Sequence, residues 1–156
     1  MKFQSMEEAV AAVHSQRTAR SLMLQTPCPE TEIERLCRES QREFCTQPPA
    51  RHLDLLRITN GFWENGLHVY ASQISDLPPP SNAAVNGFIE ATKMYRENFS
   101  GYFEQMLVFA EDDAYIYALD VPSGRFRKQA YVEREPSNVF DAFDDLIICA
   151  IEPILI

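Results

Sequence analysis

The sequence predicts an α+β domain in which a central antiparallel β-sheet is flanked by α-helices. Apolar residues recur at helical spacing early in the chain, in the segment after Gly87, and again near the C-terminus. Before this last helix, three segments from residue 106 to residue 133 have strand-like patterns and are joined by short turns. Such short connections permit only antiparallel pairing, because a parallel pair needs a long crossover.

The first two elements are expected to be helices. Ser5 followed by Glu8 forms a capping-box pattern, so a short helix begins here and ends near Gln16. Beyond the prolines of TPCPE, apolar positions repeat every three or four residues, and Glu34 and Arg38 are spaced for an ion pair on the exposed side. The positions that mark this second helix are Ile33, Leu36, Cys37, Ser40 and Phe44.

The stretch LRITNGFWENGLHVY holds two Asn-Gly pairs and the only tryptophan of the chain. We expect residues 52–59 to form a short helix that Asn60-Gly61 closes, since either residue can adopt the left-handed conformation past a last helical turn. Asn65-Gly66 then introduces a strand, and Trp63 lies on the corner between. In that strand Leu67, Val69 and Ala71 alternate with His68 and Tyr70.

A proline-rich connection over residues 75–85 leads to a helix that begins after Asn86-Gly87. The three strands of the meander follow at residues 106–110, 114–120 and 125–133. The first of them is a continuous apolar run, which is typical of a strand covered on both faces. The last element is a helix capped by Ser137 or Asn138. Its apolar positions are Phe140, Phe143, Ile147, Ala150, Ile151 and Ile154.

The length of 156 residues predicts a single domain over 1–156, with an N-terminal helix and connection in residues 1–26 and the core in 27–156. The hydrophobic fraction of 46% and the charged fraction of 24% are ordinary for a folded globular protein. No apolar run approaches the length of a membrane span, and the N-terminus lacks the apolar segment of a secretion signal. We therefore expect a cytoplasmic protein with reduced cysteines.

The formal net charge of −9 argues against a protein that binds nucleic acid through phosphate contacts, since such proteins carry a basic face. An acidic surface suits a basic partner, although solubility alone would also account for it. The acidic turn Glu111-Asp112-Asp113 is a candidate cation site, but it lacks the spaced ligands and central glycine of a calcium loop, and a solvated hairpin turn is favoured. No zinc-binding spacing, catalytic triad order or phosphate-binding loop is present. The sequence thus predicts no catalytic residue, no metal site and no cofactor.

Trp63 is the residue most suggestive of binding, because tryptophan is enriched at interface hot spots and this one lies between two glycine-bearing turns. Packing over the end of the preceding helix is an equally good interpretation. The tyrosines at 70, 115 and 117 add aromatic area with polar tips, which a core edge or a binding face could use.

Five segments of the chain carry a family resemblance: PETEIERLCRESQREF, LDLLRITNGFWENGLHVYA, NGFIEATKMYREN, MLVFAEDDAYIYALDVPSG and VFDAFDDLI. In order and spacing they resemble the SUKH superfamily of immunity and regulatory proteins, which includes the Smi and Knr types; the nearest branch is the bacterial YrhA-like group. The resemblance covers residues 27 to about 147 and is most specific at Thr59-Asn60-Gly61 and Asn65-Gly66-Leu67. Two segments depart from the family pattern: the EDDAY turn replaces a glycine-bearing turn, and the C-terminal CAIEPILI is longer and more apolar.

The resemblance implies an α+β fold and a non-enzymatic role, since many bacterial members bind and neutralise toxins, often nucleases, while related proteins act as interaction scaffolds. The leading hypothesis is an immunity-type protein that occludes the active site of a cognate basic toxin. The alternatives are a regulatory interaction module with an endogenous partner and, with less support, a metal-dependent hydrolase using Glu111 and Asp120. The expected partner contacts are Trp63, Glu64, Tyr70, Glu111, Asp112, Asp113 and Tyr115.

Overall fold

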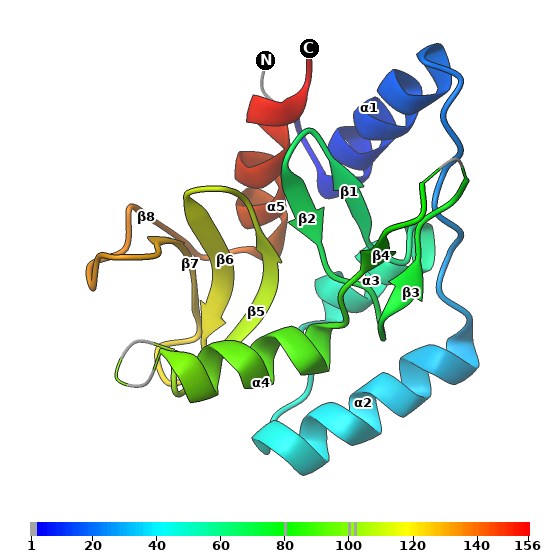
Figure 1. Ribbon diagram of the computed structural model, residues 1–156. Coiled ribbons are helices and arrows are strands. Elements are labelled where there is room, and N and C mark those ends of the chain that lie inside the picture. The colour runs from blue at the N-terminus through cyan, green and yellow to red at the C-terminus, as the bar shows by residue number, and fades with distance from the viewer. Residues whose placement is uncertain (1–2, 80, 100, 102) are drawn as a thin grey trace.

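The computed structural model describes residues 3–156 except 80, 100 and 102. Its elements form an α+β fold with a central sheet, as the sequence predicts (Figure 1). The helices are α1 (Met6–Ala19), α2 (Glu30–Phe44), α3 (Ala50–Ile58), α4 (Phe88–Asn98), α5 (Phe143–Ile151) and the 3₁₀ turn η1 (Glu152–Ile154). The strands are β1 (Phe62–Glu64), β2 (Leu67–Val69), β3 (Ser75–Asp76), β4 (Ala84–Val85), β5 (Met106–Glu111), β6 (Tyr115–Asp120), β7 (Arg125–Ala130) and β8 (Asn138–Phe140).

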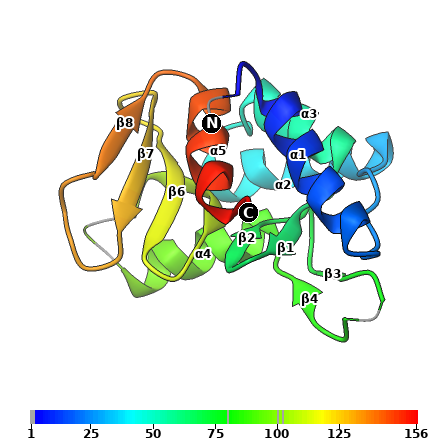
Figure 2. The same cartoon turned by 90° about the horizontal axis from the view of Figure 1, so that it is seen from above.

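Six strands form one antiparallel sheet in the order β1-β2-β5-β6-β7-β8, and β3 and β4 pair separately. The predicted meander is confirmed as β5, β6 and β7. Helix α4 packs against β5, whereas α5 packs against β6, β7 and β8. Figures 1 and 2 both show α5 lying between the meander and α1. The middle of the sheet is therefore covered, and β5 is buried along nearly its whole length.

A cluster of aromatic rings joins three helices to β5. The ring of His52 on α3 lies 4.8 Å from the ring centroids of both Phe88 and Phe109, and 5.7 Å from that of Phe143. Burial lowers the pKa of His52 to about 3, so this histidine is neutral near pH 7 and packs as one more ring. The cluster holds β5 in place, and the outer end of β5 carries the acidic turn at Glu111.

The N-terminal predictions are confirmed in type, with two differences in detail. Ser5 Oγ accepts a hydrogen bond from the backbone N–H of Glu8, as a capping box requires, but α1 continues to Ala19 rather than ending near Gln16. On α2, Arg35 contacts Glu32 at 3.1 Å and Glu39 at 2.5 Å, in place of the predicted pair of Glu34 and Arg38. Arg42 in the last turn makes longer contacts, with Glu43 at 3.5 Å and Glu39 at 4.0 Å.

The prediction that Ser137 or Asn138 caps the last helix is wrong, because this segment joins the sheet. Asn138–Phe140 form β8, with Val139 opposite Arg127 and Phe140 opposite Phe126. The backbone N–H of Ser137 donates to the carbonyl of Lys128, which begins this pairing. Helix α5 starts only at Phe143, so its helical spacing extends by chance into the strand before it.

The two Asn-Gly pairs act differently from what the sequence suggests. Helix α3 ends at Ile58, and its C-cap residue Thr59 already has an extended backbone (φ −149°), so Asn60-Gly61 does not close the helix. Asn65 and Gly66 have φ of +46° and +87° and form the two-residue turn of a hairpin between β1 and β2. Strand β1 was not predicted, because a three-residue strand leaves too few positions for alternation to be recognised. The strand predicted through Ala71 ends at Val69.

Gly61 packs directly against the backbone at the end of β2. It has a left-handed conformation with φ of +74°. A Cβ at this position would lie 2.6 Å from the Val69 carbonyl oxygen and 2.8 Å from the Ala71 nitrogen, both of which are backbone atoms. Only glycine allows the chain to pass so close to β2.

We predict that Gly61→Ala lowers the free energy of unfolding by about 3 kcal/mol or more, because the left-handed strain adds to a backbone clash. Gly124→Ala is the matched control: its φ is +69°, but nothing lies within 4 Å of the added Cβ. That control should cost only about 1–2 kcal/mol. Urea denaturation of both variants measures the difference, and equal losses would contradict the packing role assigned to Gly61.

Candidate functional site

Trp63 is at the surface, in the middle of β1. Strand alternation buries its neighbours Phe62 and Glu64 and turns the indole outward, where it is 44% exposed. Its ring lies parallel to that of His68 on β2, with an interplanar angle of 1° and a centroid distance of 4.9 Å. The sequence left open whether Trp63 packs in the core or faces solvent, and the structure places it on a rigid, exposed stack.

The same alternation removes Glu64 from the predicted contact surface. Its side chain is 2% exposed and forms ion pairs with Arg17, at 2.5 Å, and with Arg20, both near the end of α1. The amide of Gln16 donates a further hydrogen bond to it at 3.3 Å. The prediction of Glu64 as a partner contact is therefore wrong, because its carboxylate is used within the fold.

Tyr70 is also not a surface residue, and its prediction as a partner contact is wrong. The residue directly follows β2, where its backbone N–H donates to the carbonyl of Phe109 and its side chain is fully buried. Its ring packs edge-on against His68, at a centroid distance of 5.2 Å. Burial, with Glu111 nearby, raises the pKa of the Tyr70 hydroxyl far above its ordinary value.

Glu111 is held at the end of β5 by tyrosine hydroxyl groups. Its carboxylate accepts hydrogen bonds from the hydroxyls of Tyr95 and Tyr131, the latter at 3.1 Å. Burial raises the pKa of Tyr131 to about 12 and that of Tyr95 further, so both remain neutral donors near pH 7. The carboxylate of Glu111 is thus fixed in position, while its side chain keeps 27% of its exposure.

Asp112 and Asp113 have different roles, although they are neighbours. Asp112 closes the β5–β6 turn by accepting hydrogen bonds from the backbone N–H groups of Ala114 and Tyr115, at 2.8 and 2.7 Å, and from the hydroxyl of Tyr117. Asp113 is exposed, and its Oδ2 lies 3.9 Å from where a Cβ on Gly66 would be. The β5–β6 turn therefore lies beside the tip of the β1–β2 hairpin, as Figure 1 shows.

His68 links these groups. Its Nε2 accepts a hydrogen bond of 2.9 Å from the backbone N–H of Asn86, and its Nδ1 lies 3.8 Å from Glu111. Burial lowers the pKa of His68, and the nearby Glu111 opposes this shift only in part. The imidazole is therefore neutral near pH 7.

These residues surround a hollow of ≈ 460 Å³, which we call the acidic pocket. It is lined by Trp63, Gly66, His68, Glu111, Asp112, Asp113 and Tyr131. Tyr115, whose ring is covered by the Lys128 ammonium at 4.1 Å, lines an adjoining hollow with Asp112 and Asp113. Five of the seven predicted contacts thus lie together at one end of the sheet, and only Glu64 and Tyr70 are excluded from it.

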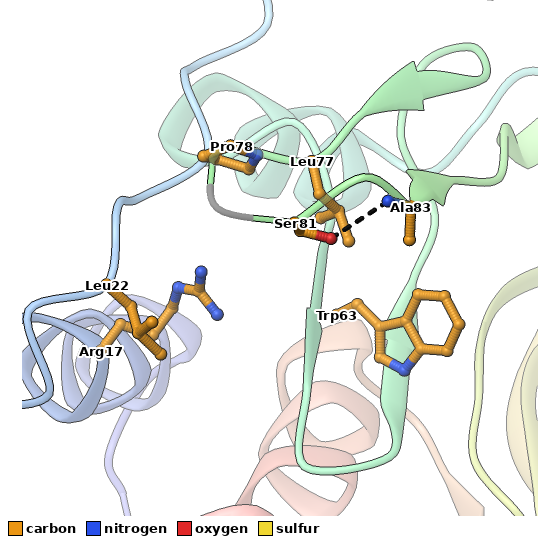
Figure 3. A pocket seen from close by; sticks show the side chains of 7 residues that line it. All are labelled: Arg17, Leu22, Trp63, Leu77, Pro78, Ser81 and Ala83. Carbon is orange, nitrogen blue, oxygen red and sulfur yellow. Dashed lines mark hydrogen bonds between the residues drawn. The ribbon is translucent and has the colours of Figure 1, made fainter.

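A second hollow of ≈ 460 Å³ lies beside Trp63 and is more apolar (Figure 3). The end of α1 and the chain after it form one side, and the β3–β4 hairpin forms the other. This hollow could not be predicted from the sequence, because its walls come from a weakly patterned helix end and a proline-rich connection. Its lining is Arg17, Leu22, Trp63, Leu77, Pro78, Ser81 and Ala83.

The acidic side chains of the pocket were predicted from the sequence, but Tyr131 was not. Tyr131 carried no local signal, since a tyrosine at the end of a polar strand is common. His68 was recognised only as lying on the face opposite Leu67 and Val69, and the structure confirms that placement.

Comparison with protein-family models, curated proteins and solved structures finds no match for this chain. Within the residues that the structure describes, no group of three or more His, Cys, Asp or Glu side chains is arranged to hold a metal ion. In the same part of the chain, no helix is both long and apolar enough to cross a membrane. The chemistry of the site therefore rests on the geometry of the acidic pocket.

We predict that Glu64→Gln lowers the free energy of unfolding by about 3 kcal/mol, because two arginines lose a buried counter-charge. Glu30→Gln is the matched control, since Glu30 pairs with Arg57 on the surface, where an ion pair contributes less than about 1 kcal/mol. Denaturant titrations of both variants test this. A loss in Glu64→Gln as small as that in the control would show that the hairpin does not depend on the ion pair.

Proposed function

We propose that this chain is a non-enzymatic, cytoplasmic immunity-type protein that binds a basic protein toxin and occludes its active site. The observation that carries the proposal is the meeting of an exposed tryptophan with three acidic side chains around one pocket. Exposed tryptophans in shaped surroundings are enriched among the residues that dominate binding energy at protein interfaces.

The charge of the chain supports a basic partner. The formal net charge is −9, and at the acidic pocket the negative side chains are concentrated beside apolar ring surface. Complementary potentials speed the encounter of two proteins, and burial of the aromatic surface then supplies affinity. A toxin that acts on nucleic acid has a basic active-site cleft, which makes such an enzyme a suitable class of partner.

The state of the site residues favours binding over chemistry. Asp112 is occupied by backbone donors, Glu111 by tyrosine hydroxyls, and His68 by the Asn86 backbone. A general base needs a free acceptor at the reacting proton, and these groups are committed to fixing the shape of the pocket. The resemblance to the SUKH superfamily agrees with this proposal, since its members act by binding.

We predict that Trp63→Ala combined with Asp113→Asn abolishes binding and protection while leaving the fold intact, because both side chains are exposed. The partner is first captured from the native organism on the immobilised wild-type chain and identified by mass spectrometry. Cells that express this partner are then tested for survival with wild-type chain, with the double variant, and with Glu34→Gln.

Glu34 is exposed on α2, so its substitution removes one carboxylate away from the pocket and controls for net charge. We expect full protection from Glu34→Gln and none from the double variant. Protection by a folded double variant would contradict the assignment of this surface. A captured partner that is not toxic to cells would instead support a regulatory interaction module.

A further inference from the structure

We propose that the acidic pocket receives the guanidinium group of an arginine side chain presented by the partner protein. This inference deepens the proposed function and rests on it only in taking the ligand to be part of a protein. The charge, ring geometry and hydrogen bonds of the described residues indicate which chemical group the pocket would bind.

In the part of the chain that the structure describes, the carboxylates of the acidic pocket have no cationic side chain among the residues that line it with them. Glu111, Asp112 and Asp113 line the pocket, and none of the described residues that line it is a lysine or an arginine. The imidazole of His68 does not supply a positive charge, because its Nε2 accepts the Asn86 N–H and so carries no proton. Partly buried carboxylates without a cation create a negative potential that a cationic ligand would complete.

Two carboxylates of the pocket keep an oxygen that a ligand could reach. Both tyrosine hydroxyls bind Oε2 of Glu111 and fix its orientation, while Oε1 lies 3.8 Å from Nδ1 of His68 and the side chain is 27% exposed. Asp113 lies at the rim, above Gly66 at the tip of the hairpin. A guanidinium group has five N–H donors in a planar fork, so it can engage carboxylates at more than one position.

A flat ring surface lies beside these carboxylates. The rings of Trp63 and His68 are stacked with an angle of 1° between their planes, and Trp63 is 44% exposed. Guanidinium groups are planar and weakly hydrated, so they stack on aromatic rings more readily than the compact, strongly hydrated ammonium of lysine. A rigid stack next to an anion therefore favours arginine over lysine.

The acidic pocket suits an organic cation better than a metal ion. The hydroxyl of Tyr70 is buried beside Glu111 and Tyr95, so it belongs to the interior network that fixes Glu111. A metal ion fits less well, because Asp112 already uses both carboxylate oxygens on donors from its own turn.

The test uses the fluorescence of Trp63, which is the only tryptophan of the chain and lines the pocket. The wild-type chain is titrated with N-acetyl-arginine amide, N-acetyl-lysine amide and the neutral isostere N-acetyl-citrulline amide, at constant ionic strength. We expect a saturable change with arginine, at least about fivefold weaker binding of lysine, and no saturation with citrulline.

Two variants keep the tryptophan and separate the pocket from general charge. Asp113→Asn should weaken arginine binding at least about fivefold, whereas Glu34→Gln on α2 should leave it within about twofold. Circular dichroism confirms that both remain folded. Equal responses to arginine and citrulline, equal affinities for arginine and lysine, no saturable response to arginine, or an unchanged affinity in folded Asp113→Asn would each overturn the inference.

The arginine titration and the protection assay can fail independently of each other. If arginine binds selectively but the captured partner is not a toxin, the pocket assignment stands and the immunity role fails. If the double variant loses protection but the wild-type chain binds no arginine, the immunity role stands and the arginine assignment is wrong.

Discussion

Two arginines at the end of α1 meet the buried carboxylate of Glu64 on β1, and the position of the whole β1–β2 hairpin depends on this ion pair. Side chains on a strand alternate between faces, so fixing Glu64 inward turns Trp63 outward. A shift of one residue would bury the indole and expose the carboxylate. The turn residue Asn65 adds a second restraint, since its amide donates to the carbonyl of Ile154 at 2.8 Å.

The acidic residues around the β1–β2 hairpin have different roles in the fold. Glu64 holds the hairpin, Asp112 closes the neighbouring turn, and Glu111 orders the tyrosines between them. Asp113 stays exposed at the rim of the pocket. The negative charge of the chain is thus partly structural, and its placement, more than its total, gives the pocket its character.

The sequence predicted the parts of the fold that are long or strongly patterned. Helix α2 and the strands of the meander have enough residues for their periodicity to be recognised. Strands β1 and β8 have three residues each, which is too few for an alternation of apolar and polar residues to be recognised. The residues of β8 were therefore predicted to belong to the start of the helix that follows. Of the site, the sequence singled out Trp63 and the acidic turn because both are locally unusual, but it left open whether Trp63 is exposed. It misplaced Glu64 and Tyr70, whose burial depends on Arg17 and on β5, both distant in the chain.

We propose that a partner protein covers the pocket end of the sheet, at Trp63. Photo-cross-linking in the native organism tests it directly, with p-benzoyl-phenylalanine placed either at Trp63 or at Ser123. Ser123 is exposed on the β6–β7 turn, at the opposite end of the meander. We expect a discrete covalent adduct with one protein from position 63 and none from position 123. An adduct from position 123 alone, with a folded but unreactive chain at position 63, would contradict it.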